Sequence, residues 1–397
     1  MLFAKLNDLS IGGKGSYGIA ASAVERKADL PTYLRITDIF DDGTLNLSEL
    51  KSVDAPNSDK YILKPNDIVF ARTGGSTGRN YFYDGSDGVF VYAGFLIKFS
   101  IDPEKVNPKY VKYYCRSKQY NDWVQSFNTG STRGNINAQI FGNMEIPLPE
   151  RKQQDYLVSI LEPIDEKIRN NKQVNDNLQQ QAAALFESWF VNYDPWDGVQ
   201  PSEWENAPLG SFVEIKRGGS PRPIQDFLSD SGLRWLKISD VTSLSSPFVL
   251  EIKEHIKEEG LRKTVFLHAG ELVLSNSATP GIPKILDVDT CIHDGWLYFP
   301  KSELSKYYLY LFFKHIRKEL VALGNGSVFT NLKTDILKAF PATKADESTL
   351  KEFDALVTPL FDAMLNADRE NFKLAAMRDA LLPKLMSSEI DVSEVEL

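Results

Sequence analysis

The chain has 397 residues, a length that suggests about two to four domains. Its two cysteines, Cys115 and Cys291, exclude a disulfide-rich scaffold, and their unrelated positions argue against a shared disulfide or metal site. The formal net charge of −9 excludes a uniformly basic protein.

The charge is unevenly distributed along the chain. Residues 1–150 carry 17 basic and 17 acidic side chains, and residues 200–344 carry 18 and 17. The acidic excess lies in residues 151–199, with 5 basic and 8 acidic, and in residues 345–397, with 5 and 12. Two nearly neutral parts can still each present a basic face, because their acidic side chains can lie on the opposite side.

The opening segment, MLFAKLNDLS, has no basic stretch followed by a long apolar run, so we expect neither a secretory signal nor a membrane anchor. No later stretch approaches the ~20 apolar residues that span a bilayer. We therefore expect a cytoplasmic protein without a membrane partner.

The first globular part is predicted to consist of short strands and turns with one helix. Residues 33–39 and 67–71 are β-branched and apolar and are bounded by turn residues, and residues 89–99 indicate a further strand. Residues 109–127 carry apolar and aromatic side chains at helical spacing. We assign the tyrosines and the tryptophan of that helix to the core rather than to a base-stacking platform.

A long helix is predicted after Pro163. Its apolar residues and asparagines recur at spacings of four and three, which is typical of a coiled-coil seam. The helix would run for about 27 residues, or roughly 40 Å, with Pro163 in its first turn or at a kink. A second helix after Pro359 follows the same frame, with Arg378 as an exception.

The second globular part and its helix repeat the first. Residues 34–39 (LRITDI) return as 236–241 (LKISDV), and residues 63–69 (LKPNDIV) return as 267–273 (LHAGELV). From Gly130 onward the match is ungapped over about 60 residues. Residues that correspond in this register are Gly130 and Gly326, Ile140 and Ile336, Pro163 and Pro359, Asn175 and Asn371, and Leu185 and Leu381. The loops between the matched blocks differ, so a common scaffold displays different side chains.

These patterns predict an α+β protein with two globular domains of short strands and helices, each followed by a long helix. The boundaries are 1–150, 151–199, 200–344 and 345–397, and the two helices would form an antiparallel coiled coil with pseudo-twofold symmetry. The residues predicted to pair the helices are Ile164, Ile168, Asn175, Leu178, Leu185, Leu360, Met364, Asn371, Leu374 and Leu381. Asn175 and Asn371 either face each other and set the register or face solvent.

Two recognition domains at a fixed distance suit a ligand that is itself divided, such as DNA half-sites about 34–36 Å apart. DNA contacts need cations and polar side chains on exposed loops. The glycine-rich loop 72–80 is the best candidate, with a simple turn as the alternative, and loops 130–135 and 326–331 either contact DNA or join domain to helix. The predicted DNA-binding residues are Lys14, Ser16, Tyr17, Arg72, Thr73, Ser76, Thr77, Arg79, Asn80, Arg133, Lys216, Arg217, Ser220, Arg222, Asn276, Ser277 and Thr279.

The order of motifs resembles the specificity subunit of type I restriction-modification systems over nearly the whole chain. The segments that carry the resemblance are 130–136 (GSTRGNI), 146–150 (IPLPE), 185–195 (LFESWFVNYDP), 204–218 (WENAPLGSFVEIKRG), 381–386 (LLPKLM) and 389–392 (EIDV). The second copy departs from the pattern at 340–343 (FPAT), which lacks the Pro-x-Pro signature of 147–149. That departure puts the second joint between domain and helix in doubt.

The resemblance implies a non-catalytic protein whose two domains each recognise one half of a bipartite, asymmetric double-stranded DNA site. It implies that the helices act as a spacer and dock two methylation subunits, and that two restriction and translocation subunits join the complex. It also implies that catalysis, S-adenosylmethionine, ATP and Mg²⁺ belong to those partners, with no cofactor bound by this chain.

The residues agree with a chain that has neither a catalytic nor a metal site. The sequence holds no phosphate-binding glycine loop followed by Lys-Ser/Thr, and its four histidines lack paired metal-ligand spacing. Three alternatives stay open: a specificity module of the kind fused to a methyltransferase-nuclease, a two-headed protein- or glycan-binding protein with a coiled-coil stalk, and, as the weakest, an enzyme.

Overall fold

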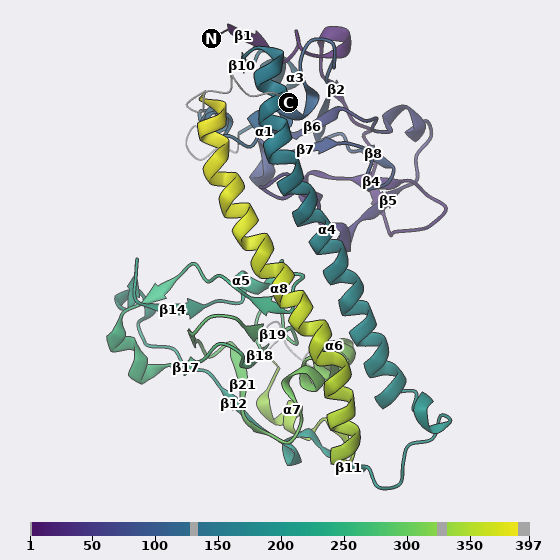
Figure 1. The fold of residues 1–397 in the computed structure, drawn as a ribbon, viewed down its shortest axis with the longest axis vertical. Coiled ribbons are helices and arrows are strands. Elements are labelled where there is room, and N and C mark those ends of the chain that lie inside the picture. Colours follow the sequence, from purple (N-terminus) through teal and green to yellow (C-terminus); the bar gives the residue numbers. More distant parts are fainter. Residues whose placement is uncertain (1, 128–133, 324–331, 388–397) are drawn as a thin grey trace. The chain divides into compact units, whose positions relative to one another are not determined.

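The computed structural model describes residues 2–127, 134–323 and 332–387 of the chain (Figure 1). The chain divides into two compact units. Unit 1 consists of Met1–Glu166 with Ala375–Leu397, and unit 2 consists of Lys167–Leu374. Two helices of 40 residues, α4 (Arg151–Phe190) and α8 (Glu347–Met386), therefore each contribute to both units.

Unit 1 is built around two four-stranded sheets, ordered β2-β9-β6-β7 and β3-β5-β4-β8, beside the antiparallel pair β1-β10. Its strands are β1 (Leu2–Lys5), β2 (Ser16–Tyr17), β3 (Ala23–Val24), β4 (Thr32–Leu34), β5 (Lys51–Val53), β6 (Asp67–Ala71), β7 (Asn80–Tyr83), β8 (Phe90–Tyr92), β9 (Leu96–Ser100) and β10 (Glu145–Leu148). Short 3₁₀ helices lie at Ile11–Gly13, Ile36–Asp38, Leu47–Glu49, Ser58–Tyr61 and Gly74–Ser76. Every residue of β6 is buried, which explains its continuous apolar run.

Three short helices pack on the sheet β2-β9-β6-β7 of unit 1: α1 (Pro108–Tyr114), α2 (Lys118–Gln125) and α3 (Ala138–Gly142). The single helix predicted over 109–127 is divided, because the Ser117 side chain accepts a hydrogen bond from the Tyr120 amide and caps a new helix. Tyr110 and Tyr120 are fully buried, which confirms their assignment to the core.

Unit 2 is built around two five-stranded sheets, ordered β12-β21-β18-β19-β15 and β13-β16-β14-β20-β17, beside the antiparallel pair β11-β22. Its strands are β11 (Glu205–Pro208), β12 (Val213–Arg217), β13 (Leu228–Ser229), β14 (Leu233–Leu236), β15 (Phe248–Val249), β16 (His255–Ile256), β17 (Val265–Leu267), β18 (Leu272–Ser275), β19 (Pro283–Leu286), β20 (Thr290–Ile292), β21 (Trp296–Ser302) and β22 (Pro341–Lys344). Its other helices are α5 (Ser239–Thr242), α6 (Lys306–Leu323) and α7 (Thr334–Ala339), with 3₁₀ helices at Asp194–Trp196, Leu209–Ser211, Ile224–Asp226 and Glu258–Lys263.

The two units share one strand topology. The order β2-β9-β6-β7 corresponds to β12-β21-β18-β19, to which unit 2 adds β15. The order β3-β5-β4-β8 corresponds to β13-β16-β14-β20, to which unit 2 adds β17. In both units the last pair of this shared four-strand order, β4-β8 or β14-β20, is parallel. The duplication therefore extends to strands, such as β2 and β12, whose sequences show no repeat.

The long helices differ from the prediction in length. Each has 40 residues, or about 60 Å, because Pro163 and Pro359 lie inside the helices rather than at their starts. A proline within a helix removes one backbone hydrogen bond, and the surrounding packing here tolerates that loss.

The buried stripe of each helix is also displaced from the predicted seam. In unit 2, Ala182, Phe186 and Phe190 of α4 belong to the same core cluster as Phe353 and Val357 of α8. Spacings of four are typical of a helix that packs on a globular core. The predicted seam residues Leu178, Leu185 and Leu360 flank this stripe and are half-buried. The other predicted pairing residues are buried (Ile164, Asn175 and Met364) or half-buried (Ile168, Asn371, Leu374 and Leu381).

The seam asparagines have other partners than the predicted one. Within unit 2, Asn175 Nδ2 donates to Asp368 Oδ1 at 2.8 Å and to the Met364 carbonyl at 3.2 Å. Asn371 Oδ1 accepts from Asn171 Nδ2 at 2.9 Å. Neither alternative holds: Asn175 and Asn371 belong to two separate hydrogen-bonded groups offset along the helices, and Asn175 is buried rather than facing solvent.

In the described ranges, no helix is both long enough and apolar enough to cross a membrane.

Candidate DNA interface

Each unit has a corner where the end of one strand crosses closely over another. In unit 1 the Gly18 amide, after β2, donates to the Leu96 carbonyl, and in unit 2 the Gly218 amide, after β12, donates to the Trp296 carbonyl. A Cβ atom at Gly18 would lie 2.3 Å from the Ala93 carbonyl oxygen, and one at Gly218 would lie 2.3 Å from that of His293. Only glycine permits this approach.

The residues around these glycines correspond in the two units. Corner 1 comprises residues 14–18, 72–73 and 93–95, and corner 2 comprises residues 216–222, 276–279 and 293–295. The pairing of β9 with β6 and of β21 with β18 aligns Leu96 with Trp296. Tyr17 consequently corresponds to Arg217, Arg72 to Asn276, and Gly94 to Asp294. Equivalent positions on one scaffold thus carry different side chains.

In corner 1, Arg72 lies over the ring of Tyr17, with its Cζ atom 5.2 Å from the ring centroid. The Tyr17 side chain is exposed, and its hydroxyl accepts a hydrogen bond from the Ala138 amide at 3.2 Å. Lys14 and Ser16 are exposed beside it. This arrangement holds a cation against an aromatic face at the surface, which suits contact with a base or a phosphate.

Most other polar side chains of the predicted loop 72–80 are buried or already bonded within unit 1. The buried Asn80 side chain donates to the Cys115 carbonyl at 3.0 Å, and Ser76 is also buried. Thr77 Oγ1 donates to the Gly74 and Gly134 carbonyls. Arg79 forms a two-point ion pair with Asp41, at 2.7 and 3.2 Å. Because these side chains already have partners inside the unit, the structure places only the start of the loop at the corner.

The segment before α3 is attached to the same loop. Thr73 forms an antiparallel bridge with Asn135, and the Ile136 amide donates to the Arg72 carbonyl at 2.9 Å. Unit 2 repeats the contact, because the Leu332 amide donates to the Asn276 carbonyl at 2.7 Å. Arg133, predicted to bind DNA, lies outside the described residues. Residues 135–136 and Leu332 thus support the loops that follow β6 and β18, whereas residues 130–133 and the whole of loop 326–331 lie outside the described residues.

In corner 2, three predicted residues meet at Asp294. Ser220 Oγ donates to Asp294 Oδ1 at 2.7 Å, and Arg222 Nη2 donates to Oδ2 at 3.3 Å. Arg217 Nε donates to the Asp294 carbonyl, and its Nη2 lies 3.9 Å from Oδ2. The hydrogen bond from Ser220 and the charge of Arg217 lower the pKa of Asp294, so the carboxylate is ionised at neutral pH.

The loop after β18 lies beside this cluster. Asn276 is buried, and its Nδ2 lies 3.4 Å from the Asp294 carbonyl, which accepts from it. Ser277 and Thr279 are half-buried, and the left-handed Ala278 (φ 59°) lies between them. Ser275 Oγ donates to the Thr279 carbonyl at 2.6 Å, so the loop is closed on itself.

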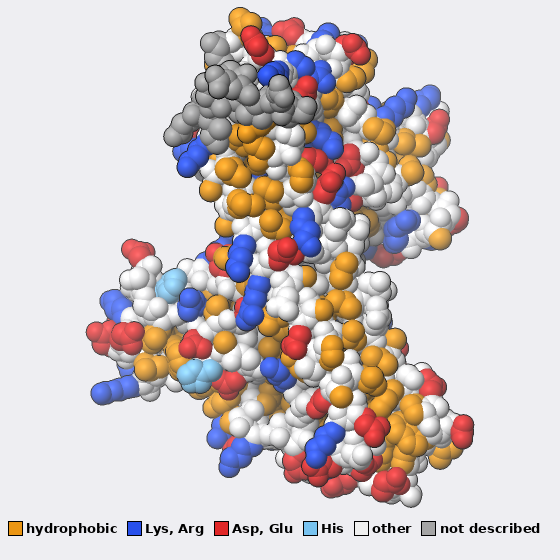
Figure 2. Space-filling view, viewed as in Figure 1, with side chains coloured by type: hydrophobic (Ala, Val, Ile, Leu, Met, Phe, Trp, Pro, Cys, Tyr) orange, Lys and Arg blue, Asp and Glu red, His pale blue; other side chains and the backbone are white. Residues whose placement is uncertain are grey.

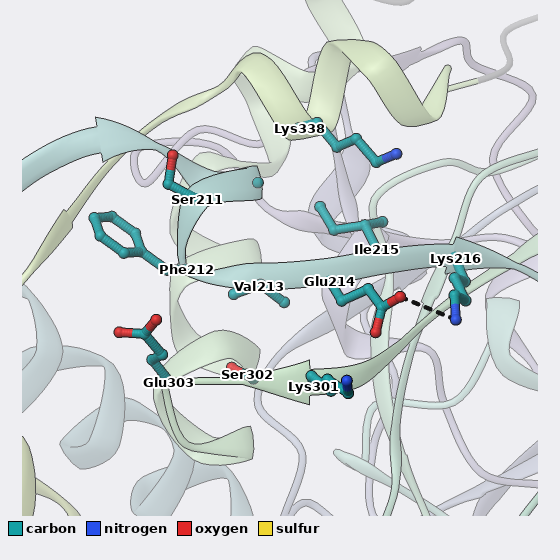
Figure 3. Close-up of a pocket in the computed structure, with 11 residues that line it drawn as sticks. Ser211, Phe212, Val213, Glu214, Ile215, Lys216, Lys301, Ser302, Glu303 and Lys338 are labelled. Carbon is teal, nitrogen blue, oxygen red and sulfur yellow. Dashed lines mark ion pairs between the residues drawn. The ribbon is translucent and has the colours of Figure 1, made fainter.

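Lys216, although part of corner 2, lies apart from the side chains that meet at Asp294. It lines an open hollow of about 620 Å³ formed by β12, β21 and Lys338 of α7 (Figure 3). Its Nζ is paired with Glu214 Oε1 at 2.9 Å, as the dashed line in Figure 3 shows. Side chains alternate across a strand, which explains why Lys216 and its neighbour Arg217 have different surroundings.

Charge is interspersed rather than gathered on the face drawn in Figure 2, where basic and acidic side chains alternate over both units. The sequence allows each unit to present a basic face, and no such face is visible on the side that Figure 2 draws. The corners instead offer single cations in defined settings, Arg72 on Tyr17 and the two arginines at Asp294.

Sequence reasoning missed two residues of corner 2. His293 and Asp294 directly follow β20. Asp294 contacts Arg217 and Ser220, which lie more than 70 residues earlier in the sequence, and His293 contacts Asp294. Burial lowers the pKa of His293, and its Nδ1 accepts from the Gly295 amide at 2.8 Å. The repeat gives no signal for Asp294, because the corresponding residue of the first copy is Gly94, which has no side chain.

The chain matches the family model described as "type I restriction modification DNA specificity domain" twice, at residues 26–180 and 201–343. It is 24% identical to the type I restriction enzyme MjaIX specificity subunit of Methanocaldococcus jannaschii, over 74% of this chain and 72% of that protein. It is 23% identical to the HindI specificity subunit of Haemophilus influenzae, over 94% and 98%.

A crystal structure of the S subunit of a type I restriction-modification system from M. genitalium has the same fold. The TM-score is 0.58 at 16% identity, and the likeness covers 97% of this chain and 95% of that one. Both family matches fall on the duplicated parts and together span most of the sequence. The chain therefore belongs to the family of type I restriction-modification specificity subunits.

Proposed function

We propose that each unit recognises one half of a bipartite, asymmetric double-stranded DNA site, and that corners 1 and 2 contribute base or phosphate contacts. The observation that carries the proposal is the unequal chemistry of the two corners on one topology. Corner 1 offers Arg72 on Tyr17, whereas corner 2 offers Arg217 and Arg222 around Asp294. A protein that recognises two different half-sites needs such a difference at equivalent positions.

The helices α4 and α8 would hold the two recognition parts at a fixed spacing as an antiparallel coiled coil with pseudo-twofold symmetry. The order of contacts inside unit 2 supports the antiparallel sense, because Asn171 contacts Asn371 whereas Asn175 contacts Asp368. On this proposal, residues 1–150 and 200–344 are the recognition domains, and residues 151–199 and 345–397 are the spacer segments.

The chain would itself be non-catalytic and would act in the cytoplasm with partner subunits. Two methylation subunits would dock on the spacer helices, and two restriction and translocation subunits would complete the complex. Those partners would supply S-adenosylmethionine, ATP and Mg²⁺ chemistry. The names of the matched relatives, which are specificity subunits of restriction enzymes, support this division of labour.

The test is to map methylated adenines across the genome of the source organism with and without this gene. We expect deletion to remove methylation from a single split motif, and complementation to restore it. Unchanged methylation would contradict the proposal if the partner genes are expressed. A mobility-shift assay with the methylation subunits present would then decide the alternative, because a protein- or glycan-binding stalk would not retard cognate DNA.

A further inference from the structure

We propose that Asp294 is a positioning residue that sets the base specificity of the second half-site, by holding Arg217 and Arg222 ready for guanine. The inference rests on the proposed function and adds to it the residue and the base. It concerns unit 2 alone, because Gly94 occupies the equivalent place in corner 1 and has no side chain to hold an arginine.

The Asp294 carboxylate joins side chains from one neighbouring segment. Ser220 occupies Oδ1 at 2.7 Å, and Oδ2 lies 3.3 Å from Nη2 of Arg222 and 3.9 Å from Nη2 of Arg217. The Asp294 carbonyl accepts Nε of Arg217. One residue thus fixes both arginines, through its backbone for the first and its side chain for the second.

The segment that carries the arginines is held against Asp294 by its backbone. The Gly218 amide donates to the Trp296 carbonyl at 2.9 Å, and the Gly219 amide donates to the Ile292 carbonyl at 3.3 Å. A side chain at Gly218 would collide with the His293 carbonyl. The backbone between Arg217 and Arg222 is therefore held beside Asp294 at Gly218 and Gly219, which keeps both arginines near the carboxylate.

Both arginines remain available to a ligand. Their side chains are 50% and 78% exposed, and the Asp294 side chain is 40% exposed. The printed bonds engage Nε and Nη2 of Arg217 and Nη2 of Arg222, which leaves Nη1 of each without a partner within the described ranges. Two arginines against one carboxylate keep the cluster cationic, which suits DNA.

Guanine is the base that this chemistry selects. An arginine that donates two hydrogen bonds to O6 and N7 of guanine is the commonest specific contact in the major groove. A free arginine side chain loses rotamer entropy when it binds, so a carboxylate that orders the guanidinium beforehand lowers that loss. An unclamped arginine would instead adapt to a phosphate or to another base, at the expense of discrimination.

The experiment uses the full chain assembled with its methylation subunits and a DNA library randomised in the second half-site. In the Asp294→Asn complex we expect the preference for guanine at one or two positions to fall by roughly ten-fold, with the first half-site profile unchanged. Asp287→Asn is the control: it weakens a different carboxylate–arginine pair of unit 2, in which Arg369 donates to both carboxylate oxygens, and should leave both profiles unchanged.

An Asp294→Asn profile identical to the wild-type profile, or a uniform loss of affinity at every sequence, would overturn the inference. A wild-type complex that methylates no split site would instead contradict the proposed function itself. If Asp294→Asn does not fold, Arg222→Lys decides, because lysine keeps the charge but loses the planar fork. Relaxed guanine preference in that variant supports the inference, and an unchanged preference overturns it.

Discussion

Arg72 and Arg79 belong to the same glycine-rich loop but have different surroundings. Arg72 lies on the exposed ring of Tyr17, whereas Arg79 is tied to Asp41 and to the Ile39 carbonyl. We expect Arg72→Ala to weaken binding of the assembled complex to cognate DNA by about 1–3 kcal/mol if it contacts a base, or to reduce the salt slope by about one if it contacts a phosphate. Titrations at several salt concentrations measure both.

Arg79→Ala is the internal comparison for that prediction. Its pair with the highly exposed Asp41 is worth about 0–1 kcal/mol of stability, so we expect a small loss of stability and a smaller loss of affinity than for Arg72→Ala. Unchanged affinity and salt dependence in both variants would exclude the start of this loop from the DNA interface.

Residue types in the sequence did not predict where the side chains point. Glycines and hydrogen-bond donors made loop 72–80 the best candidate for DNA contact, but the same residue types also build internal turns, and Ser76 and Asn80 are buried. Asp294 could not be predicted, because its partners are brought to it by the pairing of β12 with β21, a long-range contact that leaves no local pattern.

At the scale of the elements, the two seam asparagines are expected to contribute unequally. Asn175 is buried and donates to Asp368, which also accepts from Ser246 Oγ, whereas Asn371 is only half-buried. We expect Asn175→Leu to lower the free energy of unfolding by about 1–3 kcal/mol at pH 7, since it removes a donor from a carboxylate that remains in place. Asn371→Leu should change it by about 0.5 kcal/mol.

The effect of Asn175→Leu should also depend on pH. Burial raises the pKa of Asp368, so protonation is easier in the folded state, and the stability that this favours is present at low pH and lost as the pH rises. The destabilisation by Asn175→Leu should therefore be smaller at pH 4 than at pH 7 in urea titrations. Equal losses from both substitutions, or a loss independent of pH, would contradict the assigned network.

Elements were predictable where local pattern and tertiary packing agree. The repeated strands β6 and β18 follow directly from their sequences. Helix length did not, because Pro163 is a local stop signal that packing overrides. The buried stripe did not either: Phe186 and Phe190 pack on the core of unit 2 itself, a partner that a seam between two helices does not include.

At the scale of the whole molecule, unit 2 is a continuous piece of chain, whereas unit 1 is assembled from two segments far apart in the sequence. Unit 1 takes its last residues from the far end of α8, where Leu382 and Met386 enter its core and Arg378 pairs with Asp165 at 3.1 Å. The Asp165 carboxylate also binds Arg116, and the charges of these arginines hold its pKa well below the ordinary range. The C-terminal segment is thus part of the first recognition unit rather than an appendage of the second.

Because unit 1 includes the C-terminal part of α8, truncated chains give a prediction. A chain that ends at Leu374 keeps all of unit 2 but removes two buried side chains from the core of unit 1 and leaves Asp165 without Arg378. Losses of about 2–5 kcal/mol for each large buried side chain should unfold unit 1 well before unit 2. Hydrogen exchange in peptides from β6 and α1 should therefore become fast, while peptides from β18 and α6 stay protected.

A chain that ends at Ser387 is the matched control and should exchange like the full chain, because it retains the described part of α8. If β6 and α1 remain protected in the shorter chain, then the end of α8 does not stabilise unit 1.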